Sequence, residues 1–224
     1  MANATLITPE ATIAYVNIFT PRMPPKPKPG QEADFSCTLL FTPAATQTTE
    51  FQKILEEVQA LAIEKVGADK FKMLMADGKI RLPFKKDIES SGFPAEYSIY
   101  IRAKAKQKPG VVSKYEDPRN PGRFAPITDP SELWAGCKVK ASIGFYWYDT
   151  DGNKGIGVGL RNLIVVDNSK DLPRLDNRKT ADTEFLGAMA PEARASLDVS
   201  LLASGGGVGA GQGTRSSLAD MLGA

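Results

Sequence analysis

The chain contains no histidine, and this absence removes the commonest general base and the commonest metal ligand of proteins. An activated serine or cysteine would then need lysine as its base, and no local spacing of residues indicates such a pair. Aspartate and glutamate are scattered along the sequence, so a metal-dependent nuclease or recombination enzyme is the least favoured class. The sequence predicts a protein that is not an enzyme and uses no cofactor and no metal.

Cysteine is scarce, and long apolar runs are missing. Cys37 and Cys137 lie in apolar, strand-like segments, where we expect small buried residues rather than a disulfide or a zinc site. No apolar run approaches the ~20 residues of a membrane-spanning helix. The N-terminus lacks a charged segment followed by an apolar core. We therefore expect a cytoplasmic protein.

The formal net charge is only +2, so the composition as a whole does not indicate a nucleic-acid-binding protein. The distribution of charge is more informative, because residues 79–114 contain nine cations and three acidic residues. The cations of this segment are Lys79, Arg81, Lys85, Lys86, Arg102, Lys104, Lys106, Lys108 and Lys114. A local basic block of this kind favours an anionic partner.

Residues 138–161 have the pattern of a β-hairpin with a loop of three to five residues around Asp151 and Gly152. Alternation puts one apolar row on one face of the first strand. The opposite face carries Lys138, Lys140, Ser142, Gly144, Tyr146 and Tyr148, and the second strand adds Gly155, Gly157, Gly159 and Arg161 to it. This face therefore combines bare backbone, aromatic rings and positive charge.

Three alternating glycines in a strand need a reason, because glycine weakens a strand interior. One explanation is a flat ligand that approaches the backbone, with Tyr146 and Tyr148 as stacking platforms and the cations as phosphate contacts. The other is a strongly bent barrel strand that needs glycine. The hairpin alone does not decide between them.

A second strand, residues 97–106, repeats the pattern. Its apolar face begins at Tyr97, and its other face carries Tyr100, Arg102, Lys104 and Lys106. A lysine-rich strand face is often only a soluble surface. Two strands that each combine tyrosine with cations favour a surface for nucleic acid.

The remaining segments predict a mainly β protein with added helices. We expect strands at residues 12–19, 35–41 and 163–166, a helix from Thr49 with a Thr49–Gln52 capping box, and a short helix over 69–75. Residues 83–87 and 109–129 are expected to be loops. The predicted organisation is one binding domain over residues 1–167, a linker and weakly helical extension over 168–204, and a flexible glycine-rich tail over 205–224.

Two segments resemble ligand-binding motifs but lack residues or a context that those motifs require. Asp149, Asp151 and Asn153 begin like a calcium loop, but Lys154 replaces the required glycine and Leu160 the final glutamate. The alternating glycines of the hairpin are not a dinucleotide fingerprint either, because they begin a strand-like run instead of opening a helix.

Several of these segments resemble a bacteriophage family of single-stranded-DNA-binding proteins. The resemblance is carried by the hairpin (residues 144–148 and 155–161), by residues 100–104 and the loop 83–87, and by residues 15–19 followed by a proline. It covers roughly residues 12–166. It implies an oligonucleotide-binding (OB) fold, an antiparallel β-barrel decorated by helices, that coats single strands during phage replication or recombination in the host cytoplasm without strong sequence preference.

The resemblance, applied strand by strand, implies contacts to single-stranded DNA from Tyr100, Arg102, Lys104, Lys106, Lys138, Lys140, Tyr146, Tyr148 and Arg161. Many proteins of this function recruit replication or recombination partners through an acidic tail, but the last stretch here has only Asp220. The alternative function is a structural or assembly protein whose tyrosine-rich face binds another protein.

Overall fold

The computed structural model describes residues 5–27, 30–150 and 152–176. Two long strands, β9 (Lys138–Thr150) and β10 (Asn153–Asp167), form the predicted hairpin. The connection is shorter than expected, because β9 continues to Thr150 and β10 resumes at Asn153. The chain divides into two units, Met1–Arg178 and Lys179–Ala224. The second unit lies outside the described residues, as do the expected weak helices and the glycine-rich tail.

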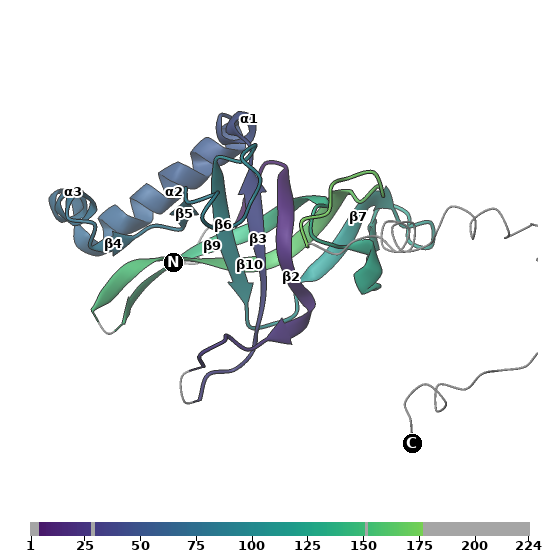
Figure 1. The fold of residues 1–224 in the computed structure, drawn as a ribbon, viewed down its shortest axis with the longest axis horizontal. Coiled ribbons are helices and arrows are strands. Elements are labelled where there is room, and N and C mark those ends of the chain that lie inside the picture. The colour runs from purple at the N-terminus through teal and green to yellow at the C-terminus, as the bar shows by residue number, and fades with distance from the viewer. Residues whose placement is uncertain (1–4, 28–29, 151, 177–224) are drawn as a thin grey trace, which may run out of the picture. The chain divides into compact units, whose positions relative to one another are not determined.

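Three further strands, β2 (Ala11–Arg22), β3 (Asp34–Phe41) and β6 (Ile99–Ala105), complete the central sheet (Figure 1). β9 pairs with β2, β2 with β3 and β3 with β6, all antiparallel. β6 meets β10 in parallel at Lys104 and Gly159. Mostly apolar side chains from one face of these strands form the main core, with Ile13, Leu39 and Ile143 fully buried. The opposite side is called the outer face below.

Helix α2 (Thr49–Val66) is the amphipathic helix that the sequence predicts, and it lies between α1 (Pro43–Thr46) and α3 (Ala68–Ala76) (Figure 1). Its buried face includes Phe51, which packs edge-on against Phe41 of β3. The predicted capping box is wrong. Thr48 caps the helix instead, because its hydroxyl accepts a hydrogen bond from the Phe51 amide.

Short strands occur where the sequence predicted none, and β5 (Phe84–Lys85) lies within the expected loop 83–87. β5 pairs with β6, β4 (Ile80–Arg81) pairs with β10, and β1 (Leu6–Ile7) pairs with β9. Within the expected loop 109–129, β7 (Gly110–Glu116) pairs in parallel with β10 and antiparallel with β8 (Phe124–Pro126). The loop prediction is wrong there because the pairing partner is distant in sequence. A 3₁₀ turn, Pro130–Glu132, precedes β9.

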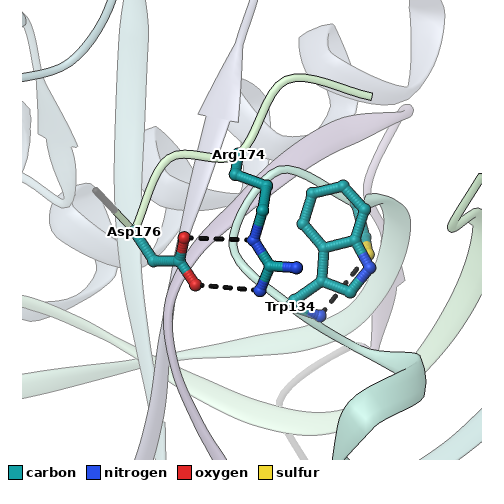
Figure 2. Close-up of polar contacts among 4 residues, drawn as sticks. Trp134, Arg174 and Asp176 are labelled. Carbon is teal, nitrogen blue, oxygen red and sulfur yellow. Dashed lines mark hydrogen bonds and ion pairs between the residues drawn. The ribbon is translucent and has the colours of Figure 1, made fainter. Parts of the chain in front are cut away.

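Residues 168–176, expected to be linker, instead contact the body of the domain. The amide of Leu175 donates to the carbonyl of Ala135 at 2.9 Å. The Arg174 guanidinium lies 4.7 Å from the centre of the Trp134 ring and makes two hydrogen bonds to the Asp176 carboxylate (Figure 2). This arrangement fixes the segment that follows β10 onto residues 134–135, just before β9.

Both cysteines are buried and free. Burial raises the pKa of Cys37 to about 12 and also raises the pKa of Cys137. Because only the thiolate reacts, neither thiol is activated. In the part of the chain that is described, no helix is long and apolar enough to cross a membrane.

We predict that neither thiol reacts quickly with a chromogenic disulfide reagent in the native protein at pH 8, because both are protonated and out of reach. Release of the chromophore should reach two equivalents only after denaturation in guanidinium. Rapid release of one equivalent from the native protein would contradict the burial described here.

Candidate nucleic-acid interface

The alternating glycines of β10 lie directly opposite aromatic residues of β9. Gly155 pairs with Tyr148, and Gly157 pairs with Tyr146. A Cβ atom on Gly157 would lie 2.3 Å from Cζ of Tyr146, and one on Gly155 would lie 2.6 Å from the Tyr148 hydroxyl oxygen. The tyrosine rings therefore lie over bare glycine backbone, an arrangement known to support glycine in sheets. This accounts for two of the three glycines without a ligand and without strand bending.

The third glycine has no ring above it. Gly159 pairs with Gly144, and a Cβ atom there would meet only the Gly144 carbonyl oxygen, at 3.7 Å. This bare strip is part of an open groove, here called the hairpin groove, with a volume of about 520 Å³. Its lining residues are Lys104, Ala105, Lys106, Gln107, Gly144, Phe145, Tyr146, Gly159, Leu160 and Arg161. The groove is of the size that small planar ligands occupy.

Tyr146 forms one wall of the hairpin groove, with 46% of its surface exposed. Partial burial, assisted by the negative charge of Asp34, raises the pKa of Tyr146 above its ordinary value, so the ring is neutral near pH 7. An exposed, neutral ring held against backbone is suited to stacking on a nucleobase.

A β-bulge lies at Arg161, whose side chain is exposed. Leu160 pairs with Ile143 and Asn162 with Ser142, so Arg161 is the extra residue of β10. Its exposure agrees with the predicted face. Alternation alone already places Arg161 on this face, and the bulge leaves Asn162 exposed beside it.

Lys104 and Lys106 lie beside a carboxylate. Lys106 Nζ is 2.8 Å from Asp34 Oδ1, and Lys104 Nζ is 3.9 Å from Asp34 Oδ2. The Asp34 side chain is only 13% exposed, and its hydrogen bond raises the pKa of Lys106. Lys106 therefore remains cationic, and one acid partly balances the charge of the two lysines.

A second groove, here called the β2 groove, lies on the outer face of β2, β3 and β6. Its lining residues are Tyr15, Asn17, Arg22, Met23, Pro24, Pro25, Asp34, Ser36, Cys37, Thr38, Arg102, Ala103 and Lys104. Lys104 lines both grooves. The strand pairings place five residues in one continuous row across the sheet: Asn17, Ser36, Lys104, Gly159 and Gly144.

The remaining residues predicted to contact DNA do not lie together in the structure. Arg102 is exposed and lines the β2 groove, whereas Tyr148 is half-buried over Gly155. Lys138 and Lys140 are half-buried and line neither groove. Lys138 donates a hydrogen bond to Thr12 at 2.8 Å.

Tyr100 is not the exposed stacking platform that the sequence predicts. It is 2% exposed, its hydroxyl lies 3.2 Å from the Asp87 carboxylate, and its ring packs against Phe93 at 5.2 Å. Strand alternation placed it correctly on the outer face, but the segment before β6 covers that end of the face. Tyr97 belongs to the same small outer cluster, rather than to the main core.

Tyr15 is the residue that sequence reasoning missed. Between Ala14 and Asn17, β2 advances three residues while its partner β3 advances two, from Thr38 to Ser36. The resulting bulge leaves Tyr15 57% exposed in the β2 groove. Regular alternation of side chains from Ile13 would point the Tyr15 ring into the main core. Its exposure can therefore be recognised only from the bulge.

Among the described residues, no group of three or more histidine, cysteine, aspartate or glutamate side chains could hold a metal ion. The grooves instead present rings, positive charge and bare backbone. They are suited to hold a flat, anionic, extended ligand.

Comparison with known proteins finds similar solved structures. The chain resembles the solved structure of the single-stranded DNA-binding protein from bacteriophage Enc34 in complex with ssDNA, with 19% identity, a TM-score of 0.56, and coverage of 76% of this chain and 89% of that one. It also resembles gp2.5, a single-stranded DNA-binding protein encoded by bacteriophage T7, with 14% identity, a TM-score of 0.51, and coverage of 80% and 100%. These likenesses show a shared fold, mostly β with a few helices. No curated protein sequence matches the chain.

A sequence model of one protein family, described as the ssDNA-binding protein of Enterobacter phage Enc34, matches residues 4–194. This match spans most of the 224 residues. The chain therefore belongs to the family of the Enterobacter phage Enc34 ssDNA-binding protein.

Proposed function

We propose that the protein binds and coats single-stranded DNA during phage DNA replication, without strong sequence preference. The observation that carries this proposal is the hairpin groove, where the exposed Tyr146 ring stands beside the bare Gly144–Gly159 strip between Lys104 and Arg161. Membership of the family supports the same function.

The groove suits single strands because their bases are free to leave the helical stack. A base that stacks on Tyr146 contributes about 1–3 kcal/mol, and stacking hardly distinguishes one base from another. The phosphates would contact Lys104, Lys106 and Arg161, so affinity should fall as salt rises. Gly144 and Gly159 present no side chain that could read a base edge, which favours tolerance of sequence.

We propose that the core is an OB-like barrel. Five strands pair in a circuit, in the order β9, β2, β3, β6, β10 and back to β9. OB folds bind oligonucleotides on one outer face of such a barrel. The binding domain would end near residue 167, and the contacts of residues 168–176 would secure that end.

The proposal includes no catalysis and places the protein in the cytoplasm of the bacterial host. Roles in recombination, and recruitment of replication or recombination proteins through the C-terminal tail, belong to the same proposal. The tail lies outside the described residues, so only the family resemblance and the sequence support that part.

We predict that oligo-dT binds far more tightly than a duplex of the same length, and that its affinity falls steeply between 50 and 200 mM salt, as phosphate contacts require. Fluorescence anisotropy of labelled strands would measure both. Equal affinity for single strand and duplex, or no loss with salt, would contradict the proposal. A protein-binding assembly module would show neither DNA binding nor salt dependence.

Replacement of Tyr146→Ala should weaken oligo-dT binding about 5- to 100-fold, the loss of one stacking contact. Tyr146→Phe keeps the ring and should bind like wild type. Gly159→Val adds a side chain where the structure has space, so the protein should fold while the groove floor is obstructed and affinity falls. Unchanged binding by both Tyr146→Ala and Gly159→Val would mean that the hairpin groove is not the site.

Lys104→Ala combined with Lys106→Ala should reduce the slope of log affinity against log salt by up to about 1.4, since each single-strand phosphate contact contributes about 0.7. The matched control is Lys53→Ala with Lys70→Ala, which removes two exposed lysines from α2 and α3. An equal change in the control would indicate a general effect of net charge rather than contacts in the groove.

A further inference from the structure

The backbone at Tyr15 is strained. Its φ is +49°, and it is the one non-glycine residue with positive φ in the described part of the chain. An aromatic residue is disfavoured in this conformation, and such strain persists only where the surroundings impose it. Exposed tyrosine at a bulge adds little burial to offset that cost, so the position calls for a role other than packing.

The surroundings hold the Tyr15 ring without covering it. Its edge contacts Phe93 at 5.7 Å between ring centres, and Phe93 in turn contacts Tyr100 at 5.2 Å. Tyr100 is fixed by Asp87 and by Ser91, whose hydroxyl lies 3.0 Å away. The buried Tyr100 thus supports, through Phe93, a ring that is more than half exposed. A pre-positioned ring loses little entropy when a ligand stacks on it.

Three cations line the same groove as the Tyr15 ring. The β2 groove includes Arg22, Arg102 and Lys104, and the Arg102 guanidinium lies 5.4 Å from the centre of the Tyr100 ring. Asn17 and Ser36 contribute small polar side chains, joined by a 3.2 Å hydrogen bond. A ring, cations and polar groups in one open groove form the same combination as in the hairpin groove.

The two grooves adjoin at Lys104, which lines both. The row Asn17, Ser36, Lys104, Gly159 and Gly144 crosses five strands, and every member except Lys104 is small or short. Four steps between neighbouring strands span about 19 Å. Tyr15 adjoins one end of this low floor and Tyr146 the other, with Lys104 in the middle.

We propose that Tyr15 forms a second base-stacking subsite, and that one DNA strand crosses the sheet along this row with Lys104 holding a phosphate between the two rings. This inference rests on the proposed function and assigns the path of the strand. Single-stranded DNA is the occupant that the geometry favours, since the row joins two aromatic platforms through a shared cation.

The test compares Tyr15→Leu, Tyr15→Phe and the control Tyr115→Leu, which removes a 66% exposed tyrosine of β7 that lines neither groove. Each variant is titrated with oligo-dT of about 2 nucleotides, too short to reach both rings, and of about 16 nucleotides, the upper limit of OB-fold site sizes. Tyr15→Leu should lower affinity for the long strand about 5- to 100-fold and leave the short strand, held at Tyr146, nearly unchanged. Tyr15→Phe and Tyr115→Leu should match wild type.

A second measurement does not depend on a variant. Photocrosslinking of wild-type protein to long oligo-dT that contains 5-iodouracil should yield a Tyr15 peptide adduct, detected by mass spectrometry. Wild-type affinity for the long strand in Tyr15→Leu, together with no adduct at Tyr15, would overturn the second subsite. If Tyr146→Ala still weakened binding, the proposed function would stand. Failure of wild type to bind either strand would instead defeat the proposed function itself.

Discussion

The contact between tyrosine rings and glycine backbone across the β9–β10 hairpin is the interaction on which the proposed interface depends. Any Cβ atom at Gly157 would collide with the ring of Tyr146, at 2.3 Å. The ring would then have to leave the sheet, and the wall of the hairpin groove would lose its position. Glycine weakens the strand at these positions. The same glycines allow an aromatic ring to lie fixed and half-exposed over the backbone. The bare pair Gly144–Gly159 lies next to that surface, so the same strand supplies both the platform and the space in front of it.

Electrostatics in the row are moderated by Asp34. A mostly buried carboxylate beside Lys104 and Lys106 positions the two ammonium groups and reduces the net positive charge that a phosphate meets. An arriving phosphate would therefore replace part of an existing ion pair rather than neutralise two free cations. Such an exchange contributes less to affinity than a bare cation would, and it lets bound DNA leave more readily.

Period-two alternation predicted the faces of β6, β9 and β10 because each strand buries one side against the main core. It could not place Tyr100, whose cover comes from the segment before β6, nor Tyr15, because a bulge interrupts the alternation of β2. β7 was missed because it pairs in parallel with a strand about 50 residues further along the chain. The role of Gly155 and Gly157 could be recognised only from the register of the hairpin, since the sequence does not say which residue lies opposite each glycine. Local pattern therefore identified the chemistry of the site, and non-local pairing decided which side chains reach it.

The two bulges link these points to function. A regular antiparallel strand can expose only every second residue, so a face built from regular strands carries rings and cations at fixed spacing. The extra residue at Tyr15 breaks that constraint and directs one more side chain outward at an end of the row. The bulge at Arg161 leaves Arg161 and Asn162 exposed as neighbours. Between the two bulges the floor is low, because Ser36, Gly159 and Gly144 carry little or no side chain. Aromatic contacts at both ends and a low floor interrupted only by Lys104 favour a ligand that is long, flexible and read by its shape and charge rather than by its sequence.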